Sequence, residues 1–307
     1  MKTRRLTLRG PLHLRQTVGP LQVHGGDPTM RLGRDELVRS CRTPDGPATL
    51  AVKVFTDGAV EAGAWGPGAQ QALEGLPRLL GEDDDTSGFE PDLHPTVARA
   101  HRRTPGLRIG ASGDVEDTLV PSILGQRVTA AEASDSYRHF VRLFGEPAPG
   151  PHDGLLLRPP AAWYVAQPEH TYRRLGIELS RERTIRAACK VVDRLQEAAA
   201  MSTEDAEARL CSVPGLGPWT SSLVQRISFG DPDPVEIGDY HIPNSVAWAL
   251  AGEARGTDER MLELLEPWRG HRGRVVRLLG LTVGGAPKHG AKQRIRNSRT
   301  MTRPWGR

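Results

Sequence analysis

The chain has 307 residues, of which 37 % are hydrophobic and 25 % charged, and its net charge at pH 7 is +4. This length allows a large core and two or three domains, and the composition is that of an ordinary globular protein. No apolar run approaches the roughly 20 residues that cross a bilayer, and no apolar stretch follows the basic N-terminus, so we predict a cytoplasmic protein.

The first 90 residues predict a small α+β domain. Short segments rich in Val, Leu and Thr alternate with turn residues such as TPDGP and FTDG, which is typical of strands. The expected strands are 29–33, 36–42, 48–55 and 59–65, followed by a helix over 68–80. The acidic, polar segment 81–89 is predicted to be a flexible linker.

From residue 91 to about 283 the pattern becomes helical. Apolar residues recur at helical spacing, and capping residues precede several segments: Thr129 with Glu132, Ser180, and Ser202 with Asp205. The expected helices are 114–126, 129–145, 168–176, 180–200, 202–212, 219–230, 240–252 and 258–280, with a Pro/Gly loop over 145–154. Residues 284–307 are expected to form a flexible tail, whose seven Lys and Arg residues meet no Asp or Glu and which can contact phosphate.

The three cysteines Cys41, Cys189 and Cys211 are too few and too far apart for a zinc site or a four-cysteine iron–sulfur cluster. Their odd number also disfavours a disulfide scaffold. We therefore expect buried, reduced thiols and no metal site.

The segment VPGLGPWTSS at 213–222 joins two of the predicted helices. Pro218 suits the first turn of the second helix, and Gly215 and Gly217 can adopt positive φ and leave the backbone uncovered. The exposed amides of such a turn, next to a helix N-terminus, form an anion site that fits a backbone phosphate. A purely structural turn between helices is the alternative.

About twenty residues further on, in VEIGDYHIP, Asp239 precedes the next apolar helix. On its own, this aspartate would be an N-cap. A hairpin, a helix, a Gly/Pro/Asp-rich loop and an aspartate at the start of the next helix together resemble the helix-hairpin-helix DNA glycosylase superfamily. With its α+β N-terminal domain, the chain is most similar to the bacterial 3-methyladenine DNA glycosylase II (alkylpurine, AlkA-like) family. The resemblance covers roughly residues 110–282, with the helix-hairpin-helix at about 203–230.

The resemblance implies roles for the residues around the hairpin. Asp239 would be catalytic, stabilising the oxocarbenium-like sugar and positioning a water molecule. Trp219 stands where strand-cutting members carry a lysine nucleophile, which implies a monofunctional enzyme. Trp219 would instead form a wall of the base pocket and attract a cationic alkylated base, with Tyr240 either at the pocket edge or in the core.

Two further matches concern the flipped nucleotide. In SILGQRVTAAEA, Gln126 and Arg127 fall at a predicted break between helices, where the resembled family carries the wedge that fills the hole left by the nucleotide. Arg127 departs from the aliphatic wedge of this branch, and a solvated surface arginine is the alternative. In EPWRGHRGRVVRLLG, Arg277 stands where the family places an aromatic pocket residue, so one wall of the base pocket departs from the family pattern.

The remaining implied contacts are with the DNA backbone. Phosphate-binding groups would be provided by Gly215, Leu216, Gly217, Thr220 and His241. For His241 the alternatives are that it orients Asp239, or that it is simply a packed or solvent-facing residue. Hairpin carbonyls can hold a structural monovalent cation in this superfamily, and no other cofactor is implied.

Together these features predict a nucleoid-associated, monomeric enzyme of base excision repair. It would bind damaged double-stranded DNA and hydrolyse the N-glycosidic bond of alkylated purines of the 3-methyladenine and 7-methylguanine type. A glycosylase for hypoxanthine or uracil fits the same scaffold. A non-catalytic module that binds lesions is the alternative from another class.

Overall fold

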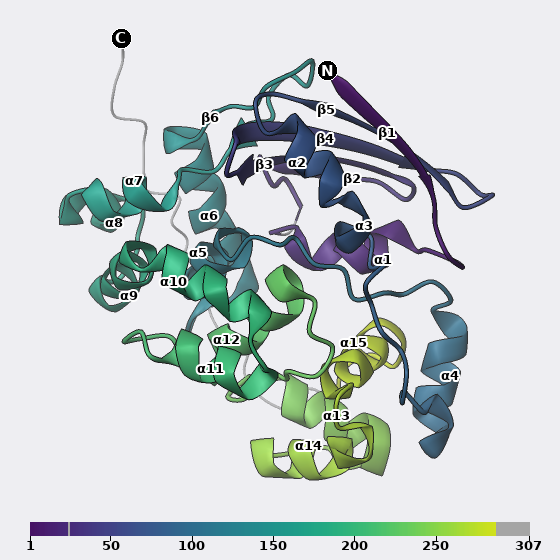
Figure 1. Ribbon diagram of the computed structural model, residues 1–307. Helices are drawn as coiled ribbons and strands as arrows, with labels where there is room; N and C mark the ends of the chain where they lie inside the picture. The colour runs from purple at the N-terminus through teal and green to yellow at the C-terminus, as the bar shows by residue number, and fades with distance from the viewer. Residues whose placement is uncertain (24, 287–307) are drawn as a thin grey trace.

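The computed structural model describes residues 1–23 and 25–286, and most of the predicted basic tail, from residue 287 on, lies outside this part. An antiparallel sheet and its covering helices lie at one end of the molecule, and the remaining helices extend away from it (Figure 1). The predicted fold class, an α+β region followed by a mostly helical bundle, is thereby confirmed. The domain boundary at residues 90–91 stays a prediction.

The N-terminal sheet has the strand order β1-β5-β4-β3-β2. Its strands are β1 (Lys2–Thr7), β2 (Met30–Leu32), β3 (Glu36–Thr43), β4 (Gly46–Val54) and β5 (Ala59–Trp65). The four predicted strands are confirmed. The tight turns after β3 and after β4 each use a glycine in the left-handed region, Gly46 at φ 121° and Gly58 at φ 82°. The basic N-terminus adds β1, which pairs with β5.

Short helices cover this sheet and complete its core. They are α1 (Leu14–Val18), η1 (Gly19–Leu21), α2 (Ala69–Glu74) and α3 (Leu76–Leu79). The single helix predicted over 68–80 is divided at Gly75, just before Pro77. Leu37, Val60 and Leu76 lie in the centre of this core and are completely buried.

The acidic segment 81–89, expected to be flexible, is instead held by ion pairs. Asp84 accepts two hydrogen bonds from Arg274, at 2.5 and 3.0 Å, and both side chains are almost completely buried. Glu82 pairs with Arg108. The expectation was wrong because its carboxylates find arginines far away in the sequence, which composition alone does not reveal.

The helical part contains two further cores. The larger one is built around Leu119, Phe140 and Ile185, and the second around Met261, Leu265 and Val275. The elements are η2 (Pro91–Leu93), α4 (Pro95–Arg103), α5 (Glu116–Gly125), α6 (Ala130–Phe144), α7 (Ala161–Ala166), α8 (Glu169–Arg174), α9 (Leu179–Lys190), α10 (Val192–Gln196), η3 (Glu197–Ala200), α11 (Thr203–Cys211), α12 (Pro218–Val224), η4 (Gln225–Phe229), α13 (Ile242–Ala251), α14 (Asp258–Leu265), η5 (Glu266–Trp268) and α15 (Arg272–Thr282).

Two of the predicted N-caps are confirmed and one is wrong. Thr129 accepts the amide of Glu132, and Ser202 accepts the amide of Asp205. Ser180 does not cap its helix, because α9 begins two residues earlier, after Glu178.

Several segments differ from the expected secondary structure. The helix predicted over 180–200 is divided into α9, α10 and η3. The helix predicted over 258–280 is interrupted between α14 and α15 by Pro267 and by Gly270, which has φ 91°. The loop expected over 145–154 starts with a short strand, β6 (Glu146–Pro147), which pairs with β7 (Leu156–Leu157).

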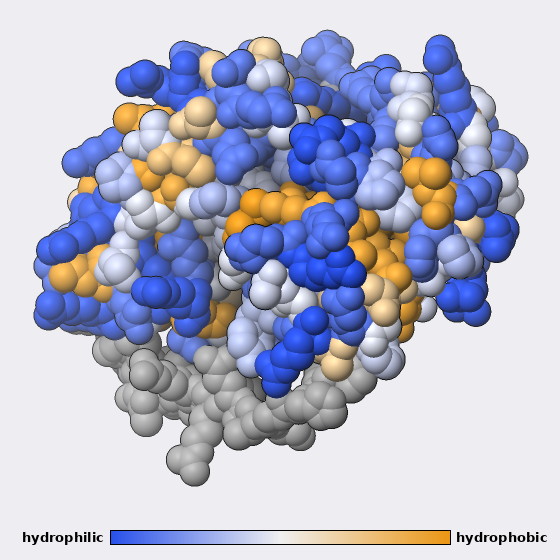
Figure 2. All heavy atoms as spheres, turned by 90° about the horizontal axis from the view of Figure 1, so that it is seen from below, coloured by the Kyte–Doolittle hydropathy of each residue, from blue (hydrophilic) through white to orange (hydrophobic). Residues whose placement is uncertain are grey.

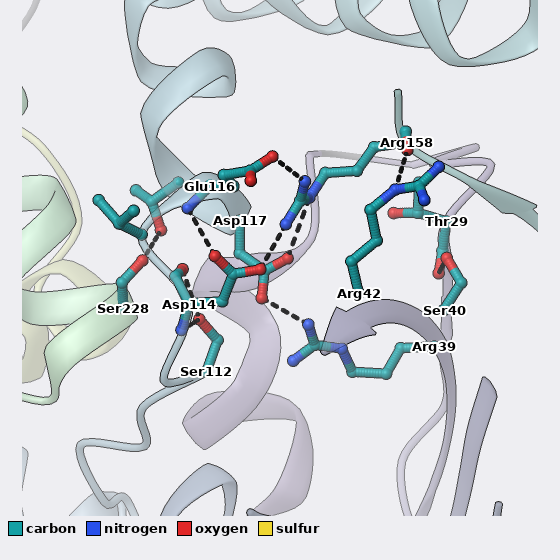
Figure 3. A network of polar contacts seen from close by, with 12 residues as sticks. Thr29, Arg39, Ser40, Arg42, Ser112, Asp114, Glu116, Asp117, Arg158 and Ser228 are labelled. Carbon is teal, nitrogen blue, oxygen red and sulfur yellow. Dashed lines mark hydrogen bonds and ion pairs between the residues drawn. The ribbon is translucent and has the colours of Figure 1, made fainter. Parts of the chain in front are cut away.

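A buried ionic cluster joins the sheet to the start of α5 (Figure 3). Arg158 pairs with Asp114, with Glu116 at 2.5 Å and with Asp117 at 3.4 Å, and Arg39 of β3 pairs with Asp117 at 2.6 Å. Three carboxylates thus face two guanidinium groups. The cluster fixes the N-terminal end of α5 against the sheet.

Because the carboxylates of this cluster outnumber its guanidinium groups, the pKa values of Asp114 and Asp117 shift in opposite directions. Burial raises the pKa of Asp114 to about 6, because Arg158 offsets only part of the cost of burying the carboxylate beside Asp117 and Glu116. Burial also acts to raise the pKa of Asp117, but the charges of Arg39 and Arg158 outweigh it and hold this pKa below its usual value.

Candidate active site at the helix hairpin

The predicted hairpin connects α11 to α12. Gly215 has φ 91°, whereas Gly217 is extended, with φ −112° and ψ −178°, and precedes Pro218 at the first position of α12. Only Gly215 therefore uses the left-handed region. Leu216, between them, is 5 % exposed and packs into the larger helical core, which anchors the turn.

The amides of Gly215 and Gly217 have no backbone or side-chain partner within the described residues, as an anion site requires. The amide of Leu216 donates to the carbonyl of Val213 at 3.0 Å, so it is already used within the turn. The side chain of Thr220 is 2 % exposed and its hydroxyl accepts a hydrogen bond from Gln126. Of the predicted phosphate contacts in the hairpin, the two glycine amides are thus the groups that remain available.

The two hairpin glycines provide a matched pair of substitutions. A Cβ atom at Gly215 would lie 2.0 Å from the hydroxyl oxygen of Thr184, in addition to the positive φ, whereas a Cβ at Gly217 would meet nothing within 4 Å. We expect Gly215→Ala to lower the free energy of unfolding by about 1–3 kcal/mol. We expect Gly217→Ala to change it by less than about 0.5 kcal/mol. Urea denaturation measures both, and equal effects would contradict this account of the turn.

The structure brings Trp219 and Asp239 together. The indole Nε1 of Trp219 donates to Oδ2 of Asp239 at 3.1 Å, and Oδ1 of Asp239 accepts the amides of His241 at 2.7 Å and Ile242 at 2.9 Å. One oxygen of Asp239 therefore accepts the amides at the start of α13, whose N-cap position is occupied by His241, and the other oxygen meets the hairpin tryptophan. Both side chains are partly exposed.

Tyr240 and His241 lie at the surface beside Asp239. Tyr240 is 80 % exposed, which excludes the core position left open by the sequence, and its ring meets the ring of His241 edge to face at 4.9 Å between centroids. Figure 2 shows the molecule from below, the side of α13 and α14: hydrophilic residues predominate there, with apolar patches between them.

Gln126 and Arg127 occupy the break between α5 and α6, as predicted, but only Gln126 makes a hydrogen bond within the described part of the chain. Nε2 of Gln126 donates to the carbonyl of Gly215 and to the hydroxyl of Thr220, both at 3.0 Å. Gln126 thus clamps the hairpin to the end of α5, a role that the sequence did not reveal. Arg127 is exposed, has φ 59°, and is the one non-glycine residue with positive φ in the described part of the chain.

Trp219 also packs against the end of α5. A Cβ atom at Gly125 would lie 3.3 Å from Cη2 of Trp219, so glycine leaves the ring the room it needs. The hairpin, the Gln126–Arg127 break and Asp239 thereby form one continuous site.

Arg277 of α15 lies against the N-terminal region. Its guanidinium donates to the carbonyl of Gln16 in α1 at 2.5 Å. Two small cavities lie between the N-terminal elements and the helical part; Arg277 lines one of them, and neither is lined by Trp219 or Asp239.

The described residues contain no group of three or more His, Cys, Asp or Glu side chains that could hold a metal ion. The three cysteines are free, and burial raises the pKa of the Cys189 thiol to about 12. None of the described helices has the length and apolar character needed to span a bilayer.

No protein-family model matches the chain. It is 31 % identical over 172 residues to a Mycobacterium tuberculosis protein named probable bifunctional transcriptional activator/DNA repair enzyme AlkA, covering 53 % of this chain and 33 % of that protein. It is 24 % identical over 186 residues to a Bacillus subtilis DNA-3-methyladenine glycosylase, covering 57 % of this chain and 59 % of that protein. The chain thus spans between a third and three fifths of the curated relatives it matches.

The solved structures extend the similarity to nearly the whole chain. A 3-methyladenine DNA glycosylase from Archaeoglobus fulgidus superposes with a TM-score of 0.76 at 15 % identity, covering 90 % of this chain and 97 % of its own. An 8-oxoguanine glycosylase/lyase from Clostridium acetobutylicum superposes with a TM-score of 0.70 at 10 % identity, covering 91 % and 96 %. The chain has the helix-hairpin-helix DNA glycosylase fold, and the resemblance of its sequence to the 3-methyladenine DNA glycosylases is confirmed.

Proposed function

We propose that the protein is a monofunctional DNA glycosylase that removes alkylated purines from duplex DNA by hydrolysis of the N-glycosidic bond. The observation that carries this proposal is the pair of Trp219 and Asp239, held 3.1 Å apart between Nε1 and Oδ2 beside the hairpin. An aromatic ring for the base and a carboxylate for the sugar are thereby placed next to a site for the DNA backbone.

Asp239 has the surroundings of a carboxylate that acts by charge. Two backbone amides and one indole N–H hold its oxygens in place, so no reorganisation is needed when positive charge develops on the sugar. The same carboxylate can accept a proton from the attacking water. Alkylation at a ring nitrogen makes the base a good leaving group, so this single carboxylate is enough for the reaction.

Trp219 supports the claim that the enzyme leaves the strand uncut. A lyase at this position needs an amine that forms a Schiff base with the sugar, and an indole cannot do so. Its ring instead offers a negative π face to a cationic alkylated base. Exposed Tyr240 would extend the rim of this base site.

The DNA backbone would be bound by the free amides of Gly215 and Gly217, with exposed His241 nearby. Such binding is independent of sequence and weakens as salt is raised.

A monovalent cation at the hairpin carbonyls stays a prediction. The carbonyls of Val213 and Gly215 each already accept one hydrogen bond from the protein. Action as a monomer in the cytoplasm also stays a prediction.

Arg127 would be the wedge that occupies the space left by the flipped nucleotide. Its side chain is exposed and has no hydrogen-bond or ion-pair partner among the described residues, while Gln126 anchors the neighbouring backbone. A left-handed backbone at a non-glycine residue costs about 1–2 kcal/mol, and such strain collects at functional sites. A long planar cation can both stack in the duplex and contact phosphate.

Two substitutions separate the strain at Arg127 from the function of its side chain. We expect Arg127→Gly to be about 1 kcal/mol more stable than Arg127→Ala, because glycine adopts positive φ without a steric cost. Both variants should release bases more slowly than the wild type, since both lack the wedge. Denaturation and single-turnover rates on a duplex with one lesion provide the measurements, and an unchanged rate in both variants would remove Arg127 from the mechanism.

The proposed function is tested with duplex oligonucleotides that each contain one lesion: 3-methyladenine, 7-methylguanine, hypoxanthine, uracil or 8-oxoguanine. We expect release of the alkylated purines, with strands cut only after alkali is added. Cutting before alkali would overturn the monofunctional assignment. Release of hypoxanthine or uracil alone would indicate another lesion class, and tight DNA binding without any release would indicate a lesion-binding module.

A further inference from the structure

The positive charge of the chain is unevenly distributed along the sequence. Seven of its 41 Lys and Arg residues, and none of its 37 Asp and Glu residues, belong to residues 287–307, which we call the basic segment. The other 34 Lys and Arg residues are outnumbered by the 37 acidic residues, so residues 1–286 carry a formal net charge of −3 at pH 7. A protein proposed to bind a polyanion is therefore negative overall before its basic segment begins.

The arginines in the interior of the described part are neutralised by carboxylates. Arg158, Arg226 and Arg274 each form an ion pair with an Asp or Glu side chain, and the three arginine side chains are between 4 % and 11 % exposed. Buried and paired charges add little to the positive potential that DNA meets at the surface. The basic segment, in contrast, brings its seven positive charges without any acidic neighbour: Lys288, Lys292, Arg294, Arg296, Arg299, Arg303 and Arg307.

The basic segment starts close to the candidate active site. The described chain ends at residue 286, and a Cβ atom at Gly285 would lie 4.0 Å from Oγ of Ser245 in α13. The amide of Ser245 donates to the carbonyl of His241 at 3.0 Å, so these two residues lie one turn apart, about 6 Å along the helix. The amide of His241 in turn donates to Asp239. The chain thus leaves the described part about one helical turn from the proposed catalytic carboxylate.

Covalent geometry limits how far the first positive charge can lie from this point. Lys288 follows Gly285 by three residues, so their Cα atoms are at most about 11 Å apart. The later basic residues follow one another at intervals of two to four residues. Phosphates recur along each DNA strand every 3.4 Å or so, about the length of one extended residue, and each basic side chain can therefore meet a different phosphate.

We propose that the basic segment binds the backbone of the duplex beside the lesion and supplies most of the electrostatic attraction between the protein and DNA. The inference rests on the proposed function, which identifies DNA as the partner. The hairpin amides, Arg127 and Asp239 would act at the damaged nucleotide, while the basic segment would hold the flanking duplex. Contacts with phosphates carry no sequence information, so the segment raises affinity without changing which base is removed.

The size of the effect follows from the release of counterions. For duplex DNA, each neutralised phosphate contributes about 0.9 to the slope of the logarithm of the binding constant against the logarithm of the salt concentration. Contacts by about four of the seven basic side chains would contribute about 3.6 to this slope. The salt dependence of binding therefore reports how many phosphates the segment neutralises.

The test uses the full-length chain with all seven Lys and Arg residues of the basic segment replaced by Gln. Fluorescence anisotropy measures binding to an undamaged duplex oligonucleotide between about 50 and 200 mM salt. We expect the slope to fall by about 3 or more, and the affinity at about 150 mM salt to fall by about 10-fold or more. The single-turnover rate of base release with saturating enzyme should stay at the wild-type value, because the segment takes no part in the reaction.

A matched pair of variants separates the position of the charges from the net charge of the chain. The first variant combines Arg294→Gln, Arg296→Gln and Arg299→Gln in the basic segment. The control removes the same number of charges from the N-terminal sheet and its turns, where the side chains are 73 %, 90 % and 57 % exposed, through Arg5→Gln, Arg34→Gln and Lys53→Gln. We expect the slope to fall by about 2 to 3 in the first variant and to stay unchanged in the control.

Three results would overturn the proposal. A wild-type slope and affinity in the sevenfold variant would show that the segment does not contact DNA. Tighter binding in that variant would show that the segment covers acidic groups of the protein itself. Equal changes in the matched pair would show that the net charge of the chain matters and the position of the segment does not.

The outcomes also distinguish this inference from the proposed function. If the wild type releases alkylated purines and the sevenfold variant binds DNA as tightly as the wild type, the glycosylase assignment holds and the role of the segment fails. If the variant loses affinity for DNA but the wild type releases no lesion, the role of the segment holds and the glycosylase assignment fails. A wild type that does not bind duplex DNA would overturn both.

Discussion

Asp239→Asn is expected to lower the single-turnover rate of base release by about 10²- to 10⁴-fold, the range that a positioned acid–base group contributes. The substitution removes the negative charge that would face the oxocarbenium-like sugar, and it removes the group that would accept a proton from water. It also places an amide opposite Nε1 of Trp219, which now donates to the carboxylate at 3.1 Å. Binding to DNA should be retained, because one negative charge near a polyanion is lost.

The variant is expected to fold. The side-chain oxygen of asparagine can still accept the amides of His241 and Ile242 at the start of α13, as that of aspartate does. Asp205→Asn is a suitable control, since Asp205 also lies at the start of a helix of the hairpin motif and is exposed, and it should release bases at the wild-type rate. A wild-type rate in Asp239→Asn would mean that the carboxylate takes no part in the reaction.

Arg158→Met is expected to have the largest effect on stability, with a loss of about 3–5 kcal/mol in the free energy of unfolding near neutral pH. Arg158 is 6 % exposed and pairs with three carboxylates, Asp114, Glu116 and Asp117. Without it, Arg39 alone remains in the cluster to offset three partly buried carboxylates, whose side chains are between 10 % and 27 % exposed. Removal of one side of a buried pair is costly because the remaining charge loses its partner and does not regain its hydration.

The loss in the free energy of unfolding caused by Arg158→Met should be smaller in mild acid than near neutral pH. The pKa of Asp114 in the folded protein, about 6, lies above its ordinary value of 3.8, so the folded state binds a proton more tightly than the unfolded chain. Stability therefore falls as the pH rises from about 4 to about 6. Without Arg158 the pKa of Asp114 rises further. The difference between wild type and variant should thus be larger at about pH 8 than at about pH 5.

Denaturant unfolding of both proteins at the two pH values measures this difference. Arg5→Met provides the control, because Arg5 of β1 lies in the same sheet and its ion pair with Glu61 is exposed, with side chains 73 % and 52 % exposed. Exposed pairs contribute about 0–1 kcal/mol, so this variant should lose little and show little dependence on pH. A difference for Arg158→Met that does not change with pH would contradict the role of Asp114.

Local signals in the chain were sufficient to predict most of the strands and helices and the hairpin. Short segments rich in Val, Leu and Thr, separated by turn residues, predicted β2 to β5, and capping residues predicted the starts of α6 and α11. Both kinds of signal are local, because strand propensity, turns and caps depend on residues close together in the chain. The hairpin and the approach of Trp219 to Asp239 were predictable for a similar reason: one helix and one short loop span the twenty residues between them.

The contacts between long polar side chains, in contrast, could be identified only in the folded chain. Gln126 turns to the carbonyl of Gly215 instead of projecting outward, Asp84 of the expected linker pairs with Arg274, and Arg277 contacts the carbonyl of Gln16. These partners lie between 89 and 261 residues apart in the sequence. A charged side chain can equally well be solvated or paired, and composition and periodicity are the same in both cases. Packing of the N-terminal region against the helical part brings these groups out of water, and their burial then requires that each finds a partner.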